Sequence, residues 1–372
     1  VKSNKNKLFE LHKKLRTLPF FDPACGCGNF LVIAYRELRK LELDVLRAVH
    51  EGPGSRFLDI HSEISVDVDQ FFGIEIEEFP AQIAQVALWL MDHQMNVMAG
   101  EEFGLYFARI PLKVTPHIVH GNALRLEWSD VLPAEKYSYE SGNPQFVGHH
   151  LQSSEQQADM LRCLRNAPSA VVLDFVCAWY CLAADYIAGT RVKVAFVSTN
   201  SITQGEQIGI LWRALMQRCL LHIHFAHRTF RWSNEASGNA HVYCVILGFA
   251  AFEPENRTSV DYEDVDGDAH PIDATAINTN PSGHQGVPLT NTNPHRAPHP
   301  RPHRTYRQNR HVHQYLSTAG PHHVRQRLAQ PVGQIARSCT LCNHAGCEQG
   351  CIRHGQVQTQ RLDRFTDRGA DH

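Results

Sequence analysis

The chain has 372 residues, of which 43% are hydrophobic and 20% are charged, enough to bury the core of one large domain or two smaller ones. This composition excludes a peptide, a fibre and a fully disordered chain. The 36 basic and 38 acidic residues leave a formal net charge of −2 but are unevenly spread: residues 279–372 hold 12 arginines, no lysine and only 4 acidic residues.

Short apolar runs alternate with longer stretches of helical periodicity up to residue 250. The predicted elements, in chain order, are a strand at 18–22, a helix at 31–49, a strand at 70–75, a helix at 80–98, a strand at 116–120, a helix at 170–188, a strand at 192–198, a helix at 208–220 and strands at 221–225 and 241–250. Such alternation indicates βαβ units. We therefore predict an α/β fold with a doubly wound, mostly parallel sheet covered by helices on both faces.

Two segments of residues 1–278 fit this pattern poorly. Residues 137–141 would supply a further strand, but Ser, Glu and Ser stand where a buried parallel strand should be apolar. Residues 253–273 carry eight carboxylates and one arginine, which predicts a solvated acidic loop.

The segment 279–372 lacks hydrophobic periodicity and is rich in Pro, His and Arg, so we expect a low-complexity, disordered tail outside a catalytic domain at 1–278. Our hypothesis is that this tail is foreign to the protein and was translated from a shifted reading frame. Four cysteines within it suggest a zinc site, but their close spacing and the lack of an apolar surrounding lead us to expect no metal. They are Cys339, Cys342, Cys347 and Cys351.

The remaining cysteines lie mostly in apolar or motif positions, which favours a reducing cytoplasm over a disulfide framework. Residues 1–16 are basic and amphipathic and do not resemble a signal peptide. The one stretch of membrane length, 170–188, contains Asp174 and Asp185, each costing roughly 2.5–3.5 kcal/mol at a bilayer centre. We expect no membrane association.

The run Asp22–Phe30 (DPACGCGNF) lies where the first predicted strand gives way to the first helix. Glycines there let backbone N–H groups approach a ligand at the carboxyl ends of the strands, where α/β folds bind nucleotides. An ordinary tight turn is the alternative. Glu75 ends the second strand, where an acid can accept hydrogen bonds from ribose hydroxyls, and a solvated surface carboxylate is the alternative.

The run Asn143-Pro144-Gln145-Phe146 follows the polar segment at 137–141. The Asn side-chain oxygen and the Pro carbonyl can accept the two hydrogens of an exocyclic amine, while the Phe ring stacks on an extruded base. A simple loop that contains Asn-Pro is the alternative.

Together these motifs resemble those of class I S-adenosylmethionine-dependent DNA methyltransferases that methylate the N6 amine of adenine, as in the modification module of combined type II restriction-modification enzymes. The family reads DPACGSGNF and Asn-Pro-Pro-aromatic, so Cys27 replaces a Ser and Gln145 replaces a Pro. The second change removes a fixed φ and adds an N–H group.

The resemblance implies a Rossmann-like domain that acts on double-stranded DNA with a flipped adenine. In it, Glu75 would bind the ribose of S-adenosylmethionine and Asn122 its adenine, and Phe230 or Trp232 would form a second wall of the base pocket, although core aromatics are the alternative there. The methionine end would lie against Asp22, Ala24, Cys25, Gly26 and Gly28, and the catalytic residues would be Asn143, Pro144 and Phe146.

Two other functions stay open. The chain lacks an upstream nuclease domain and an N-terminal cofactor-contacting segment, so we expect a fragment. The first alternative is therefore a catalytically impaired remnant that at most binds cofactor. A protein-glutamine methyltransferase is the other alternative, because such enzymes share the Asn-Pro-Pro-aromatic loop.

Overall fold

The computed structural model describes residues 2–50, 63–103, 114–136, 139–165, 168–232, 242–262, 269–274, 277–278 and 287–288. Nearly the whole segment after residue 278 lies outside them, including the four cysteines considered as zinc ligands. The division into a catalytic domain and a tail therefore stays a prediction. Within the described residues, none of the helices combines the length and the apolar character needed to span a bilayer.

The predicted helices and strands occur in the predicted order, and the structure adds helices at 2–16, 128–131 and 154–163 that were not predicted. The helices are α1 (Lys2–Arg16), α2 (Asn29–His50), α4 (Glu78–Phe103), α5 (Trp128–Val131), α6 (Ser154–Cys163), α7 (Cys177–Tyr186), α8 (Gly205–Gln207) and α9 (Arg213–Arg218). The strands are β1 (Phe20–Asp22), β2 (Phe71–Glu75), β3 (His117–His120), β4 (Tyr139–Gly142), β5 (Lys193–Thr199), β6 (His222–Trp232), β7 (Val242–Ala250), β8 (Arg257–Tyr262), β9 (Ala269–Ala274), β10 (Ile277–Asn278) and β11 (Val287–Pro288).

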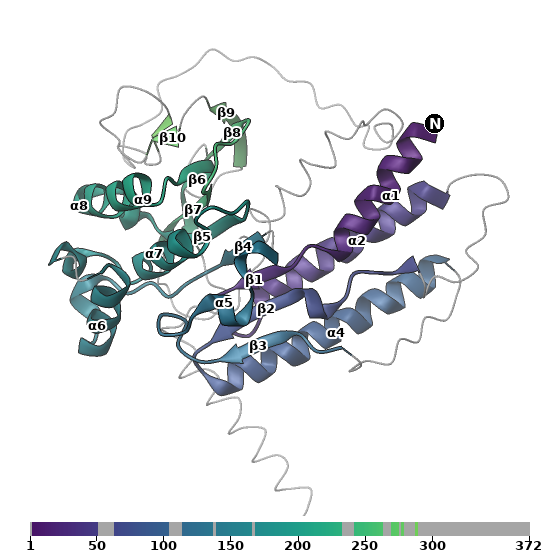
Figure 1. Cartoon of the computed structure of the whole chain (residues 1–372), viewed down its shortest axis with the longest axis horizontal. Helices are drawn as coiled ribbons and strands as arrows, with labels where there is room; N and C mark the ends of the chain where they lie inside the picture. The colour runs from purple at the N-terminus through teal and green to yellow at the C-terminus, as the bar shows by residue number, and fades with distance from the viewer. Residues whose placement is uncertain are drawn as a thin grey trace, which may run out of the picture.

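The strands β1 to β9 form one sheet in the order β3-β2-β1-β4-β5-β7-β6-β8-β9 (Figure 1). The first five of these run parallel to their neighbours, whereas β7 is antiparallel to both β5 and β6. The order reverses between β1 and β4, which is the kind of switch point beside which open α/β sheets bind ligands. The structure confirms the predicted α/β fold.

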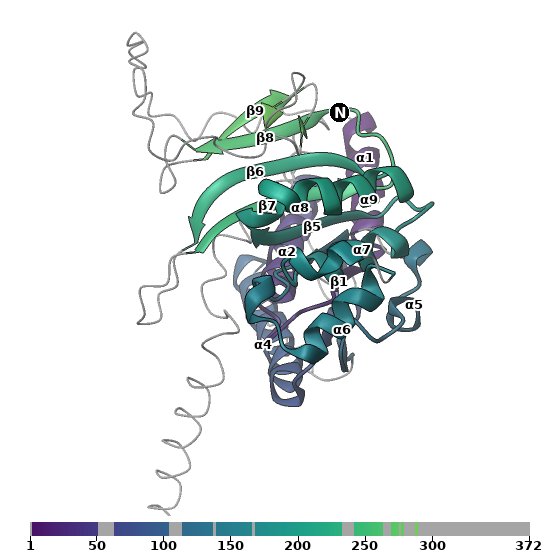
Figure 2. The same cartoon turned by 90° about the vertical axis from the view of Figure 1, so that its left-hand side faces the viewer.

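Helices cover both faces of the sheet (Figures 1 and 2). Successive side chains of β1 point to opposite faces. Phe21 packs against Trp128 in the hydrophobic cluster beneath α6 and α7, with ring centroids 5.5 Å apart. Phe20 stacks on Phe71, at 5.3 Å, next to the cluster beneath α1, α2 and α4. The sheet is therefore doubly wound, as predicted.

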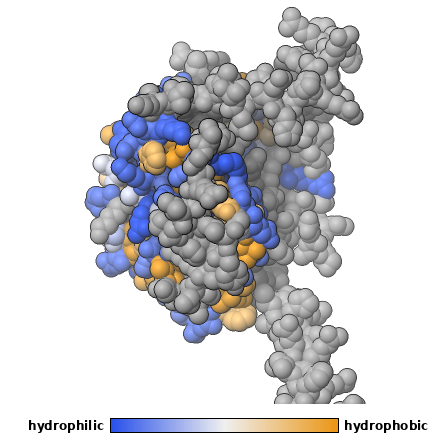
Figure 3. Space-filling view, turned by 90° about the vertical axis from the view of Figure 1, so that its right-hand side faces the viewer, coloured by the Kyte–Doolittle hydropathy of each residue, from blue (hydrophilic) through white to orange (hydrophobic). Residues whose placement is uncertain are grey.

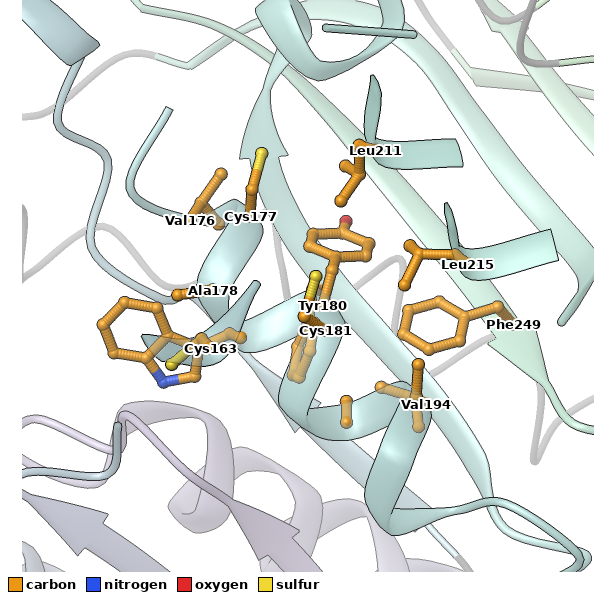
Figure 4. Packing of buried hydrophobic residues seen from close by; sticks show 14 of the residues in the cluster. Cys163, Val176, Cys177, Ala178, Tyr180, Cys181, Val194, Leu211, Leu215 and Phe249 are labelled. Atoms are coloured by element: carbon orange, nitrogen blue, oxygen red, sulfur yellow. The ribbon is translucent and has the colours of Figure 1, made fainter. Parts of the chain in front are cut away.

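Tyr180 on α7 belongs to the hydrophobic cluster beneath α6 and α7 (Figure 4). Its ring stacks on Phe249 with centroids 5.4 Å apart, and its hydroxyl lies 2.7 Å from Ser198 Oγ. Leu211 and Leu215 pack around the same ring from the helical segment that precedes β6. This core fixes α7 against the carboxyl half of β5.

The prediction of one continuous helix over 170–188 is wrong. A 3-10 turn spans Pro168–Val172, and α7 begins only at Cys177. Between them, the Asp174 carboxylate accepts a hydrogen bond from the backbone N–H of Val176 at 3.3 Å, and the Asp174 carbonyl accepts one from Cys177. A short acidic side chain that bonds nearby N–H groups competes with a continuous helix, which explains the break.

The prediction of a solvated loop over 253–273 is also wrong, because β8 and β9 lie in this segment and pair antiparallel. Ser259 and Tyr262 of β8 are buried. The acids there find partners: Asp261 accepts a hydrogen bond from Arg228 of β6 at 2.9 Å, and Glu253 pairs with His222 at 2.7 Å and with Arg257. Counting charges alone missed the strand-forming residues between them.

The polar segment before Asn143 does form a strand, contrary to the objection raised from its sequence. β4 lies between β1 and β5 and is parallel to both. Glu140 and Ser141 are buried there, at 1% and 5% exposure. The backbone ladder on both sides supplies the hydrogen bonds that hold this short strand in place.

On the side of the molecule shown in Figure 3, hydrophilic residues cover much of the coloured surface and hydrophobic residues form separate patches. Scattered apolar side chains are ordinary on a protein surface and do not mark a site by themselves.

Candidate active site

The carboxyl ends of the five neighbouring parallel strands lie at one edge of the sheet. The residues at these ends are Asp22, Glu75, His120, Gly142 and Thr199. Asn122 and Asn143 follow two of the strands within two residues. Two predicted site residues therefore end strands and two others come directly after strands, at the edge where such folds bind ligands.

The loop from β1 to α2 folds back against β2. Cys25 N donates a hydrogen bond to Ile74 O at 3.0 Å, and Gly28 N donates to Cys25 O at 2.8 Å. Gly26 and Gly28 have φ angles of +55° and +82°, which glycine adopts at little cost. A Cβ at Gly28 would lie 3.0 Å from Ala84 Cβ of α4. The turn therefore requires its glycines, and it packs against both β2 and α4.

Glu75 is linked to this loop through its carboxylate. Oε2 accepts a hydrogen bond from Gly26 N at 2.9 Å, and Oε1 accepts one from Glu77 N at 3.1 Å. At 3% exposure Glu75 is not the solvated surface carboxylate that was the alternative. A carboxylate offers about four acceptor positions, so Glu75 keeps capacity for hydroxyl donors from a ligand.

Asp22 holds a buried carboxyl group at the centre of the site, at 1% exposure. Oδ1 accepts a hydrogen bond from Ala24 N at 3.0 Å, whereas Oδ2 accepts none from the described part of the chain. Burial raises the pKa of Asp22 to about 8, against the lowering effect of the Ala24 N–H and together with the nearby negative charge of Glu75. A positively charged ligand group beside Oδ2 would stabilise the ionised form.

The loops that follow β1 and β4 converge. An added Cβ at Gly142, the last residue of β4, would lie only 2.6 Å from Asp22 Oδ1, so the two strand ends come this close only because residue 142 is glycine. The loop after β1 and the Asn-Pro loop after β4 therefore meet at one rim of the sheet, although 121 residues separate Asp22 from Asn143 in the chain.

The Asn-Pro loop carries an unused acceptor and anchors an aromatic ring. Asn143 Oδ1 is buried and accepts no hydrogen bond from the residues that the structure describes. Pro144 is buried. Phe146 is half-buried and packs against the hydrophobic clusters of both sheet faces. An unused acceptor beside a fixed ring suits a planar ligand that carries N–H donors.

Asn122 stabilises its own turn. Its Oδ1 accepts a hydrogen bond from Leu124 N at 2.9 Å, and its Nδ2 donates to Asp159 Oδ2 at 3.1 Å. Asp159 is held in turn by Arg125 at 3.0 Å and Arg162 at 2.6 Å. Asn122 is thus a firmly placed turn residue at the candidate site, and its contact with a cofactor adenine stays a prediction.

The two aromatics considered for a second pocket wall lie on β6. Phe230 is 6% exposed and packs on Tyr262, with ring centroids 5.6 Å apart, in the cluster beneath α2. This is what the core-aromatic alternative describes. Trp232 ends β6, and its side chain lies outside the described residues. A role for either residue against a base stays a prediction.

The sequence reasoning missed two residues that hold the Asn-Pro loop. Asp174 entered it only as a charge that argues against a membrane span, and Gln152 did not enter it at all. Both bond to Val147, the residue after Phe146, at 3.1 Å. A sign of this existed in the sequence, because an isolated Asp in an apolar run needs hydrogen-bond partners when it is buried.

A known family accounts for this arrangement of loops on the sheet. The family described as "MmeI, DNA-methyltransferase domain" matches residues 1–261, and the chain belongs to it.

Two relatives are informative. The chain is 40% identical over 250 residues to DNA methyltransferase A of Bacillus subtilis (strain 168), a match that covers 66% of this chain and 28% of that protein. It is also similar to the solved Type IIL restriction-modification enzyme MmeI in complex with DNA, with a TM-score of 0.72 and 58% identity over 75% of this chain and 37% of that one. The chain thus spans well under half the length of either relative.

Proposed function

We propose that this chain is the catalytic part of a cytoplasmic restriction-modification enzyme and transfers a methyl group from S-adenosylmethionine to the N6 amine of adenine in double-stranded DNA. The observation that carries the proposal is that two buried acceptors, Asp22 Oδ2 and Asn143 Oδ1, make no hydrogen bond within the described chain, and that Asp22 and Asn143 lie at the ends of adjacent strands. Asp22 Oδ2 suits a cationic group of a ligand, and Asn143 Oδ1 suits the N–H donors of an amine.

The residues of the first loop fit S-adenosylmethionine. Asp22 would accept a hydrogen bond from the ammonium of its methionine end, which would stabilise the ionised carboxylate. Glu75 would accept hydrogen bonds from the ribose hydroxyls, and Asn122 would contact the adenine. Ala24, Cys25, Gly26 and Gly28 would lie along the methionine chain. When bound, the cofactor supplies an electrophilic methyl group.

The Asn-Pro loop would hold the other reactant. Asn143 Oδ1 and the Pro144 carbonyl would accept the two N6 hydrogens of an extruded adenine, which turns the nitrogen lone pair away from ring conjugation and towards the methyl group. Phe146 would stack on the base. The N6–methyl bond would form as the methyl–sulfur bond of the sulfonium breaks, and one N6 proton would leave to solvent. No residue would need to form a covalent intermediate, because the sulfonium supplies the driving force and the two loops supply the alignment.

The chain should bind S-adenosylmethionine in calorimetry and should produce N6-methyladenine in a mixed-sequence duplex, detected by mass spectrometry of the nucleosides. Asn143→Ala should keep the binding and lose the product. Transfer to a release-factor protein but not to DNA would overturn the assignment in favour of a protein-glutamine methyltransferase.

A remnant that binds cofactor without turnover is the second candidate, because Gln145 stands where the family has Pro. Cofactor binding without any methylated adenine would favour it. If Gln145→Pro then restored methyl transfer, the substitution would be the cause.

A further inference from the structure

Asp174 lies in the bend between the 3-10 turn Pro168–Val172 and α7. Its side chain is 4% exposed and reaches the loop that follows β4 and the end of β5. Neither segment is its neighbour in the chain, since Val147 lies 27 residues before it and Thr199 lies 25 residues after it.

The carboxylate accepts hydrogen bonds from three elements. Oδ1 accepts one from Val147 N at 3.1 Å and one from Val176 N at 3.3 Å, and Oδ2 accepts one from Thr199 Oγ1 at 3.1 Å. Asp174 thereby links the Asn-Pro loop, the start of α7 and the end of β5.

The peptide groups of Val147 are held on both sides. Its N–H donates to Asp174, and its carbonyl accepts hydrogen bonds from Phe175 N at 3.0 Å and from Gln152 Nε2 at 3.1 Å. The same Gln152 amide donates to Leu173 O at 2.9 Å. Residues 173–175 and Gln152 therefore form a clamp around the residue that directly follows Phe146.

We propose that Asp174 is a positioning residue for methyl transfer: by fixing Val147, it holds Phe146 and Asn143 in the geometry that receives the extruded base. This inference rests on the proposed function. Asp174 touches neither reactant, and it acts only through the loop backbone.

Three variants of the full chain test the inference. Asp174→Ala removes all three hydrogen bonds. Asp174→Asn keeps an oxygen that can accept from Val147 and Val176 but places an NH2 group opposite Thr199. Asp92→Asn is the matched control, because Asp92 is also a buried acid, bonded to Tyr35 Oη at 2.6 Å, but lies on α4 away from the loop.

The first measurement is hydrogen exchange of the amides of residues 143–151, at a temperature where every variant is folded. Asp174→Ala should speed exchange in this segment, and Asp92→Asn should leave it unchanged. Unchanged exchange in Asp174→Ala would overturn the clamp, and this readout does not depend on catalysis.

The second measurement separates positioning from general destabilisation. Asp174→Ala should lower kcat on the order of 100-fold, the cost of a reactant misplaced by about 1 Å, while the KM for S-adenosylmethionine stays within about twofold. Asp174→Asn should recover most of the rate. Faster loop exchange with an unchanged kcat, or a loss shared equally by Asp92→Asn, would overturn the inference.

The two proposals fail in different ways. If the unmodified chain binds DNA and cofactor but transfers no methyl group to adenine, the proposed function is overturned and with it the catalytic role of Asp174. The exchange data then still decide whether Asp174 holds the loop.

Discussion

Among the described residues, the buried polar side chains between the helices α2 and α4 differ from those at the carboxyl edge of the sheet in how fully they are paired. Between the helices, Arg39 donates hydrogen bonds to Tyr35 Oη at 3.1 Å and to Asn96 Oδ1 at 3.0 Å, and its charge faces Glu42 and Asp92, both at 3.5 Å. At the sheet edge, Asp22 and Asn143 each keep an acceptor that bonds to nothing in the described chain.

The pKa values show the same contrast. Burial alone would raise the pKa of Glu42, but the hydrogen bond with His12, the charge of Arg39 and the backbone N–H groups of Ser65 and Val66 outweigh it, and the pKa is lowered. Burial raises the pKa of Asp22, and no comparable set of donors opposes it. The buried charges of the first group stabilise one another, whereas the unpaired acceptors of the second group are available to a ligand.

The largest expected effect on stability comes from Arg39→Met, which keeps the apolar stem but leaves Glu42 and Asp92 buried without their cation. The unfolding free energy should fall by about 3–5 kcal/mol in urea denaturation. Arg36→Met is the control, because Arg36 pairs with Glu37 at the surface and should contribute less than about 1 kcal/mol. Equal effects of the two variants would remove the contrast.

Asn143→Ala should show the opposite pattern. We expect kcat for methyl transfer to fall on the order of 10²–10³-fold, because a fixed acceptor for the amine is lost. The unfolding free energy should change by less than about 1 kcal/mol, since Asn143 Oδ1 makes no hydrogen bond in the described chain. The control Asn96→Ala should destabilise the helices without changing the kcat of the folded protein. A large stability loss in Asn143→Ala would contradict the assignment.

Asp22 should make stability depend on pH. The pKa of its carboxyl is 3.8 when unfolded and about 8 when folded, so between these values the folded state holds a proton that the unfolded state has lost. This contribution is complete below pH 3.8 and disappears as the pH rises through 8, with a slope of at most about 1.4 kcal/mol per pH unit. Urea denaturation from pH 5 to pH 8 gives the unfolding free energy of the chain and of Asp22→Asn. If the two unfolding free energies change with pH in parallel, the prediction is refuted.

The smallest effect is expected for Gln145→Pro, which restores the motif of the family. Proline at a compatible position restricts the unfolded chain and should raise the unfolding free energy by about 0.4–1 kcal/mol. A loop held more firmly should also transfer methyl groups up to about fivefold faster. Gln145→Ala, which does not fix φ, should show neither gain, and a destabilised Gln145→Pro would mean that the loop has a φ that proline cannot adopt.

The sequence predicted the fold well where one periodicity dominated. The apolar alternation before Asp22 and Glu75 and the helical spacing after them placed both residues at strand ends. The prediction from the sequence failed where a side chain fixes the backbone conformation by bonding to a residue far away in the chain. Asp174 does this when it accepts a hydrogen bond from Val147 and interrupts the expected helix. In β8 the number of carboxylates led to the prediction of a loop, although less polar and more polar side chains alternate along this segment up to the buried Tyr262.

The candidate site was predicted in part. Glycine spacing and the Asn-Pro run are local patterns, so both loops could be found from the sequence. The structure adds that the two loops meet, because β1 and β4 are parallel neighbours in the sheet. The clamp around Val147 and the bond between Glu75 and Gly26 could not be found in this way, because they join residues that only the folded chain brings together. The same holds for Arg39, whose burial depends on how α2 packs against α4.

The glycine loop and the Asn-Pro loop leave strands that are hydrogen-bonded neighbours in the sheet. Adjacent strands are held about 4.8 Å apart, so no hinge can separate these two loops without breaking the ladder between β1 and β4. The two loops that follow β1 and β4 therefore form a rigid part of the candidate site. Under the proposed function, the motion that brings a base to these loops therefore takes place in the nucleic acid and not in the sheet.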